Sequence, residues 1–576
     1  MPDEIKGMFG GKDKPNCQSG YVLYEKGMAF NNSIKLNETI RVNENFYIGK
    51  QWEGVQANGL PTPQFNFLKR VTGFIVATIT TDNVKVTASA LSNTPNTNEL
   101  VEPVRIVNEE FEALAEQNRI PSMLREFARN AAVDGDGCLY TYWDENAENG
   151  QKAKGAIRTE VIENNRVFFG NPNDRRVQTQ PWIIISSREI VRNVCRRAKE
   201  NGFDEWESIT SDLDERDVDP EKITHDDKVT VLLLLWRDEE SGKIWAYEFT
   251  RNCGVKKPWD TLLSLYPITW LPWDYVPDCY HGQAMITGLI PNQIFVNKVF
   301  ALTQVSLMRT AFPKYIFDST RIKKLDNRVG GAIGIAGGDI NNAIKSIDPA
   351  SISPQIAQFI ELTITKTEES LGATSVALGD TRPDNTSAII ALQRAASTPT
   401  EMTKQCLYQS VEDLFRIYLD FMGEYYGKRM VDMPTPERVK ALYAFIGQQA
   451  PDEIAMEFDF SLLKQHPMIL KLDAGASSYY SEIASMNTLD NLLMNGHITI
   501  LQYLERIPDG YIPARRALIS EIMRTTQQPQ TPAMPGQPAG GATNLDVGAK
   551  PEIPTGGGFG ALQRKVLESG TTEGMV

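Results

Sequence analysis

Three aspartates near the end of a predicted helix come closest in type and spacing to a metal site. Asp134 and Asp136 lie in the run DGDG, and Asp144 follows in the same segment. Carboxylates so placed could hold a divalent cation for a reaction on nucleic acid. A calcium loop of the EF-hand type starting at Asp134 is disfavoured, because Leu139 occupies its sixth position, where glycine is needed. A turn is the favoured interpretation of DGDG.

The other residue types that commonly carry catalysis are scattered along the chain. The histidines at positions 225, 281, 466 and 497 belong to no HExxH motif, and the sequence has neither a GxxxxGK[ST] loop nor a GxSxG elbow. Asp212 and Asp214 lie in a charged run that is typical of a solvated loop. The six cysteines form no CxxC pair, which indicates reduced thiols in a cytosol. These absences do not exclude an enzyme, but they remove every specific reason to propose a catalytic residue, a metal or a cofactor.

Length and charge restrict the class of protein further. A chain of 576 residues with 41% hydrophobic residues can form several cores, and no stretch approaches the roughly 18 apolar residues of a membrane span. The net charge of -14 argues against a protein whose whole surface coats nucleic acid, because such surfaces are rich in lysine and arginine. An acidic wall around a nucleic-acid passage is compatible with this charge. We expect no membrane contact.

The pattern of residues along the chain predicts an α+β protein. Residues 1–37 are rich in glycine and charge, and we expect them to be flexible. One helix is predicted over 104–132 despite Pro121, and short β-branched runs predict a β-rich region over 155–277. Within that region, residues 188–202 form a basic helix. A solvated face is the favoured interpretation of its charges, and phosphate contact is the alternative.

A helix that is apolar on most of its circumference is predicted over 282–309. Such a helix must be buried on several sides. Gln293 and Asn297 lie one turn apart on it, so they could hydrogen-bond to each other or to a neighbouring helix. A short β excursion and a return helix follow. The expected arrangement is therefore an antiparallel stalk with a small tip.

A long helix is predicted after the stalk and a polar loop. Its apolar residues recur at steps of three and four from Leu407 to Tyr425. Pro399 is expected to kink it, because proline removes one hydrogen bond and clashes with a carbonyl one turn back. Strand-like pieces and short helices follow. The Pro/Gly-rich end of the chain is expected to be disordered.

Five segments, taken in order and with their spacing, resemble a portal protein of tailed bacteriophages. The resemblance covers approximately residues 40 to 525. The segments are ENFYIGKQWEG (44–54), PQFNFLKRVTGFI (63–75), AAVDGDGCLYTYWD (131–144), HGQAMITGLIPNQIFVNKVF (281–300) and LGATSVALGDTRPDNTSAIIALQ (371–393).

The architecture of that family implies a division of the chain into named parts. These are a flexible N-terminus (1–37), a wing of N-terminal helices and a β-rich part (38–280), a first stem helix (281–312), a small α/β clip (313–352), a second, antiparallel stem helix (353–371), a tunnel loop (372–386), a long kinked helix (387–427), a wing return (428–476), a helical crown (477–526) and a disordered tail (527–576).

The resemblance also implies a function and a set of partners. Members of this family form a ring, usually of twelve subunits, at one vertex of the capsid. Double-stranded DNA passes through the ring without sequence specificity during genome packaging and ejection. Terminase, head-tail connector or adaptor proteins, and the major capsid and scaffold proteins contact it. We therefore expect a homo-oligomeric virion protein without enzymatic activity, assembled in the host cytoplasm.

Three groups of residues are expected to carry this function. The DNA-facing residues of the tunnel loop are expected to be Asp380, Thr381, Arg382, Asp384, Asn385 and Thr386. The clip residues expected to meet DNA or an acidic docking protein are Arg321, Lys323, Lys324 and Arg328. The stem residues Gln293 and Asn297 are expected to contact neighbouring subunits. Simple exposure to solvent is the alternative for the loop and clip residues.

Two other functions stay open at the level of sequence. A metal-dependent enzyme acting on nucleic acid would use Asp134, Asp136 and Asp144 as ligands, and metal-dependent nuclease or ATPase activity would favour it. Another virion connector or minor capsid protein would lack the paired stem helices.

Overall fold

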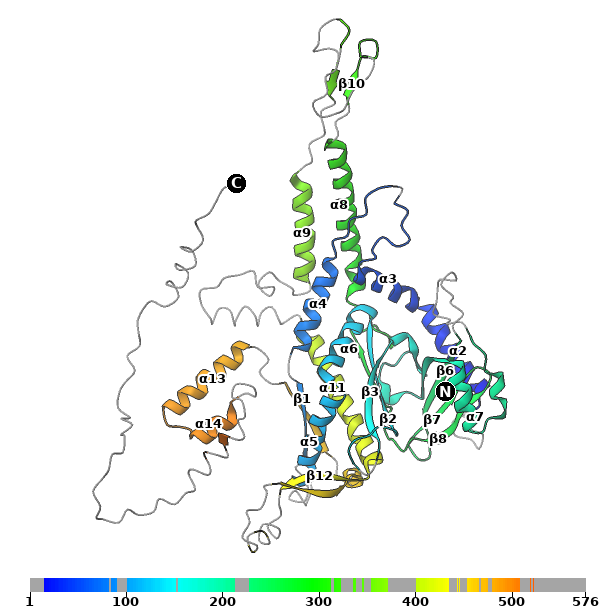
Figure 1. The fold of residues 1–576 in the computed structure, drawn as a ribbon, viewed down its shortest axis with the longest axis vertical. Coiled ribbons are helices and arrows are strands. Elements are labelled where there is room, and N and C mark those ends of the chain that lie inside the picture. Colours follow the sequence, from blue (N-terminus) through cyan, green and yellow to red (C-terminus); the bar gives the residue numbers. More distant parts are fainter. Residues whose placement is uncertain are drawn as a thin grey trace, which may run out of the picture. The chain divides into compact units, whose positions relative to one another are not determined.

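The computed structural model describes most of the chain between residues 15 and 507. The described residues are 15–57, 59–81, 84–90, 101–151, 154–212, 227–311, 315–322, 335–337, 344–346, 354–370, 400–434, 443, 445, 453–465, 468–474, 479–507, 518–519 and 522. Helices and strands are mixed along the chain, so the predicted α+β class is confirmed (Figure 1). The chain divides into two compact units, Met1–Ser485 and Met486–Val576.

The first unit begins with a helix that packs on a five-stranded antiparallel sheet. The helix is α2 (Cys17–Ser33), and Asn16 caps its first turn in a capping box. Leu23, Tyr24 and Met28 on α2 form a core with residues of the sheet. The strands, in the order in which they pair, are β4 (Val167–Phe169), β5 (Trp182–Ile190), β6 (Lys228–Arg237), β7 (Ile244–Phe249) and β8 (Gly254–Asp260).

The helix α2 corrects the expectation of flexibility for residues 17–33, while residues 1–14 lie outside the described residues. A Cβ atom built on Gly20 would lie 2.5 Å from the ring of Phe249, and one on Gly27 would lie 2.7 Å from the ring of Phe168. These two glycines therefore allow the helix to approach the sheet closely. Their spacing of seven residues places them on one helical face, which was the available signal.

One edge strand of this sheet was not expected. The strands β6 and β7 pair antiparallel, within the region where β structure was predicted. β8 pairs with β7 but carries Pro258 and two lysines, so its sequence lacks the apolar alternation of a strand. Proline is tolerated there because β8 lies at the edge of the sheet.

The next part of this unit combines helices with a three-stranded antiparallel sheet. The helices are α3 (Leu36–Ile48), α4 (Phe67–Thr80), α5 (Val101–Gln117) and α6 (Ile120–Asp134). The helix α7 (Val191–Glu200) packs instead on the five-stranded sheet, against β5 and β8. The three-stranded sheet has the order β3 (Ala156–Ile162), β2 (Asp136–Asp144) and β9 (Ile268–Pro272). The single helix predicted over 104–132 is two helices. Arg119 adopts a φ of 52° between them, and Pro121 lies in the first turn of α6, where no N–H is required.

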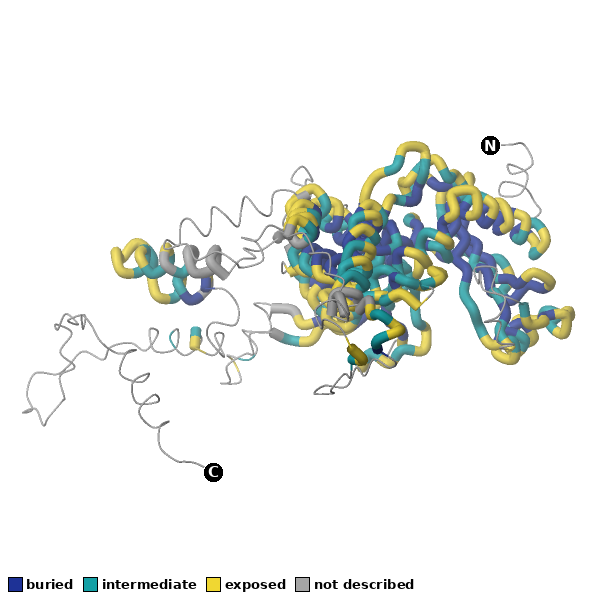
Figure 2. Tube along the Cα trace, turned by 90° about the horizontal axis from the view of Figure 1, so that it is seen from above, coloured by how far each residue is buried: buried dark blue, intermediate teal, exposed yellow. Residues whose placement is uncertain are grey.

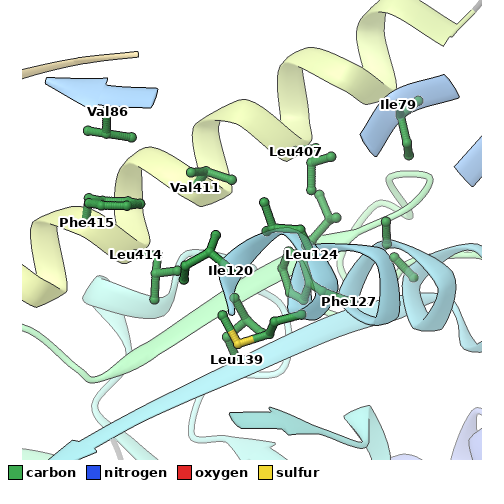
Figure 3. Packing of buried hydrophobic residues seen from close by; sticks show 14 of the residues in the cluster. Ile79, Val86, Ile120, Leu124, Phe127, Leu139, Leu407, Val411, Leu414 and Phe415 are labelled. Atoms are coloured by element: carbon green, nitrogen blue, oxygen red, sulfur yellow. The ribbon is translucent and has the colours of Figure 1, made fainter. Parts of the chain in front are cut away.

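The helix α11 (Glu401–Phe421) lies in the main hydrophobic core, as its apolar spacing predicted. Figure 3 shows Leu407, Val411, Leu414 and Phe415 on its buried face, close to side chains of α6 and of strands β1 and β2. In Figure 2, buried positions gather in the interior of this unit. A π-helical turn, Met422–Tyr426, follows α11. The kink at Pro399 lies outside the described residues.

Two helices of the first unit lie side by side, with a β pair at the end of the excursion between them (Figure 1). They are α8 (Ile290–Ala311) and α9 (Pro354–Ser370), and the strands are β10 (Tyr315–Phe317) and β11 (Ile344–Ser346). Asn292, in the first turn of α8, donates a 3.0 Å hydrogen bond to Thr367, near the end of α9, so the helices run antiparallel. α8 starts later than residue 282, because Pro291 fits only in a first turn.

Two further antiparallel pairs belong to the first unit, and the first of them joins distant parts of the chain. They are formed by β1 (Val84–Ala90) with β14 (Met468–Ala474), and by β12 (Lys428–Pro434) with β13 (Glu453–Asp459). The helix α13 (Tyr479–Met494) spans the boundary between the units, and α14 (Ile500–Arg506) belongs to the second. Tyr503 on α14 donates a 2.5 Å hydrogen bond to Asp490. None of the helices in the described ranges is long and apolar enough to cross a membrane.

Candidate functional site

The base of the α8/α9 pair contains a buried chain of side-chain amides. Gln293 donates hydrogen bonds to the carbonyl of Phe65, at 2.6 Å, and to Oδ1 of Asn297, at 2.9 Å. Asn297 in turn donates to Oε1 of Gln51 at 2.6 Å. Three segments far apart in the sequence thereby meet at the start of α8. Oε1 of Gln293 has no hydrogen-bond partner, but the other contacts favour this arrangement, because breaking them would leave further buried polar groups unpaired.

This network corrects the role expected for Gln293 and Asn297. Their mutual hydrogen bond, one of the options predicted from the sequence, is present. However, the two side chains are only 0% and 3% exposed within a single chain, so their atoms are not available to a neighbouring subunit. They position α8 on its own chain instead.

The exposed surface of the helix pair is apolar farther from its base. On α8, Leu302, Leu307 and Met308 are 69%, 53% and 54% exposed, and on α9 Phe359 and Leu362 are 59% and 51% exposed. Leu302 and Phe359 each lie about 12 to 15 Å along their helix from the Asn292–Thr367 bond, at 1.5 Å per residue, and so stand at similar height. The sequence indicated that most of the surface of this helix is apolar, but not which part of that surface is exposed to solvent.

Most residues expected to meet DNA or a docking protein lie outside the described residues. This holds for the tunnel-loop residues Asp380, Thr381, Arg382, Asp384, Asn385 and Thr386, for Pro399, and for the clip residues Lys323, Lys324 and Arg328. Arg321 is described, in the turn after β10. Its Nε lies 3.4 Å from Oδ2 of Asp318, and both side chains are partly exposed. The partner-docking role of this cation stays a prediction.

The three candidate metal ligands separate in the structure. Asp136 begins β2 and Asp144 ends it, so they are about 26 Å apart at roughly 3.3 Å per residue. Asp134 lies at the end of α6, 3.7 Å from Arg129. In the ranges that the structure describes, no three His, Cys, Asp or Glu side chains gather in a way that could hold a metal ion. The three aspartates therefore do not form the metal site that a metal-dependent enzyme acting on nucleic acid would need.

Asp136 has a structural partner that the sequence did not indicate. Its Oδ2 lies 2.8 Å from Nδ1 of His281, and its Oδ1 accepts a 2.7 Å hydrogen bond from the backbone of Gly282. Nε2 of His281 lies 3.2 Å from Asn31 on α2. A His–Asp pair can serve as a general base, but His281 is buried and both of its ring nitrogens are engaged. The pair therefore ties α2, β2 and the segment before α8 together.

Asp134 lies in a cluster of charged side chains between α3 and α6, together with Glu44 and Arg129. Burial, followed by the nearby Glu44 carboxylate, raises the pKa of Asp134 to about 8, and Arg129 opposes this shift only in part. Arg129 forms a 2.6 Å hydrogen bond with Glu44. The carboxyl of Asp134 therefore keeps its proton to a higher pH than an ordinary aspartate does. This makes the group sensitive to pH without giving it an open substrate site.

Other charged residues considered from the sequence also serve the fold. Asp212 forms an ion pair with Arg188 and accepts a 3.0 Å hydrogen bond from the backbone of Thr230. Arg197 on α7 pairs with Glu189 at 3.0 Å and with Glu248 at 2.8 Å. These contacts favour a structural role for the basic segment over phosphate binding.

No protein-family model matches the chain, and no curated protein is significantly similar to it.

Proposed function

We propose that this chain is the subunit of a portal-type ring, which conducts double-stranded DNA through one vertex of a viral capsid. The observation that carries the proposal is the antiparallel α8/α9 pair with the β10–β11 strands at the end of its excursion. Another connector or minor capsid protein is expected to lack such a pair, so its presence favours the portal interpretation. The proposed role is structural, without catalytic residues or cofactor.

The exposed apolar side chains on this helix pair would favour assembly, because contact with a neighbouring subunit would remove them from water. Covering Leu302, Leu307 and Phe359 would gain about 25 cal/mol for each Å² removed from water. Identical neighbours can provide that cover through a heterologous interface, which generates a ring if its rotation closes. We propose twelve subunits, following the usual number in the resembling family.

The proposed path of DNA involves residues that the structure does not describe. In a ring of twelve copies, the polar segment 380–386 would repeat as a belt around the duplex. Weak contacts with phosphates suit a conduit, because tight or sequence-specific binding would hinder movement of DNA. Terminase, head-tail connector proteins, and capsid and scaffold proteins are the proposed partners, and the capsid vertex is the proposed location.

Negative-stain electron microscopy and mass photometry of the purified protein test the proposal. The expected particle is a ring with a central channel and a mass close to twelve subunits. Low and physiological salt should both be sampled, because charge repulsion in an acidic protein weakens at higher ionic strength. A monomer or a twofold dimer without a channel under every condition would contradict the proposal.

A further inference from the structure

A groove between the two larger sheets of the first unit has the size of a ligand site. Its volume is about 840 Å³, within the range of sites that hold small molecules or peptide segments. Residues of β2 and β3 line it, together with residues of β5, β6, β7 and β8 and Arg197 of α7. None of the described residues proposed for subunit assembly or DNA contact lines this groove.

Aromatic rings form part of its lining. Tyr140 and Tyr142 of β2 stack with their ring centroids 5.7 Å apart, and Trp259 of β8 also lines the groove. The ammonium group of Lys256 lies 4.1 Å from the centre of the Trp259 ring. The groove thus already holds one cation on an aromatic face, an arrangement stabilised by the ring quadrupole.

Among the charged side chains that line the groove, one carboxylate forms no ion pair with the described residues. Arg166 pairs with Glu163 at 2.7 Å, and Arg197 pairs with Glu189 and Glu248. Glu160 has no cationic partner among the residues that the structure describes. It lies directly opposite Tyr140 in the β2–β3 register. Glu160 is exposed to solvent on the open side of the groove, and partial desolvation by the surrounding groove raises the pKa of its carboxyl.

We propose that this groove binds a peptide segment of a partner protein through an arginine or lysine side chain, whose cation pairs with Glu160 beside the Tyr140 and Tyr142 rings. The lining extends along β5 from Ile185 to Glu189, about 13 Å at 3.3 Å per residue. A guanidinium or ammonium group alone would fill only part of that length, so an extended peptide fits better than a free small cation. The inference does not depend on the proposed ring.

Isothermal titration calorimetry on the full-length protein tests the site with three probes. They are the peptide acetyl-Gly-Leu-Arg-Leu-Gly-amide, the same peptide with neutral citrulline in place of arginine, and agmatine as a free guanidinium. The arginine peptide is expected to bind about fivefold or more tightly than the citrulline peptide, the size expected for one partly exposed ion pair. The variant Glu160→Gln should abolish that difference.

Glu239→Gln is the matched control, because it removes the same charge from an exposed loop outside the groove. It should leave the preference for arginine unchanged. Glu160→Gln is expected to unfold at or above the temperature of the unaltered protein, since it breaks no ion pair. Equal binding of the arginine and citrulline peptides, or no saturable binding up to about 1 mM, would overturn the site. Agmatine binding as tightly as the peptide would overturn the peptide as its occupant.

Discussion

The side-chain amide of Asn297 donates a 2.6 Å hydrogen bond to Oε1 of Gln51, 246 positions earlier in the chain. Both residues are buried, so neither can exchange this partner for water. The bond therefore holds the first turns of α8 against the segment between α3 and α4. The orientation of the helix pair depends on it.

Replacing Asn297 should destabilise the fold. Asn297→Ala leaves Oε1 of Gln51 and one N–H of Gln293 without this partner, so the free energy of unfolding should fall by about 2 kcal/mol. Urea denaturation followed by tryptophan fluorescence measures the change. Lys298→Ala, at the exposed neighbouring position on α8, should cost less than about 0.5 kcal/mol. Equal effects of the two substitutions would contradict the role of the amide chain.

Adding a methyl group at Gly27 should weaken the packing of α2. The new Cβ in Gly27→Ala would lie 2.7 Å from the Phe168 ring, and overpacking of this kind costs about 1–3 kcal/mol. Gly73→Ala is the control, because Gly73 is in α4 and has nothing within 4 Å of the added atom. That variant should gain about 0.5–1 kcal/mol. Thermal unfolding separates the two, and stabilisation by both would show that α2 does not pack as described.

Stability should decrease as pH rises toward 8 because of Asp134. Its pKa is about 8 in the folded chain and about 3.9 in the unfolded chain, so the folded state binds the extra proton between these values. This contribution is complete below about pH 4 and is lost as pH rises through about 8, by up to about 1.4 kcal/mol per unit. Differential scanning fluorimetry at pH 5.5 and 7.5 should show a smaller loss for Asp134→Asn than for the unaltered protein.

Asp144→Asn provides the control for that measurement, since Asp144 lies at the far end of β2. It should retain the full pH dependence of the unaltered protein. Identical pH profiles for all three proteins would remove Asp134 as the source.

Charges on the helix pair should prevent assembly of the proposed ring. In the double variant Leu302→Glu/Phe359→Glu, two exposed apolar side chains become carboxylates that repel their counterparts in neighbouring subunits. Mass photometry should find monomers with an unchanged far-ultraviolet circular dichroism spectrum. Val22→Glu, on the exposed face of α2, should still assemble. Rings formed by the double variant would place the subunit interface elsewhere.

Shortening the segment 379–386 should separate assembly from DNA transport. If this segment faces DNA, the shortened protein should form rings of the same mass but support less genome packaging by its terminase. Packaged DNA protected from nuclease is the measurement. Loss of rings in this variant would assign the segment to subunit contacts instead.

Features encoded by neighbouring residues were predictable from the sequence. The steps of three and four from Leu407 onward predicted the buried face of α11, and DGDG predicted the end of α6. The helix, β pair and return helix of the stalk also followed from local composition. These features are predictable because backbone conformation and the burial of one helical face depend mainly on residues a few positions apart.

Tertiary structure decided which of several locally permitted outcomes occurred. Gly20 and Gly27 were compatible with a flexible terminus or with close helix packing, and the rings of Phe249 and Phe168 select the second. Likewise, Pro121 begins a new helix instead of interrupting a longer one. In both cases the choice depends on neighbours in space.

By itself, the sequence determined the α+β class, the core face of α11 and the stalk. Only the tertiary structure decided that Asp136 meets His281 instead of Asp144, and that Gln293 and Asn297 face inward. The physical reason is that hydrogen bonds between buried side chains join residues hundreds of positions apart. A local pattern specifies that such a group needs a partner, but not which partner the fold brings to it.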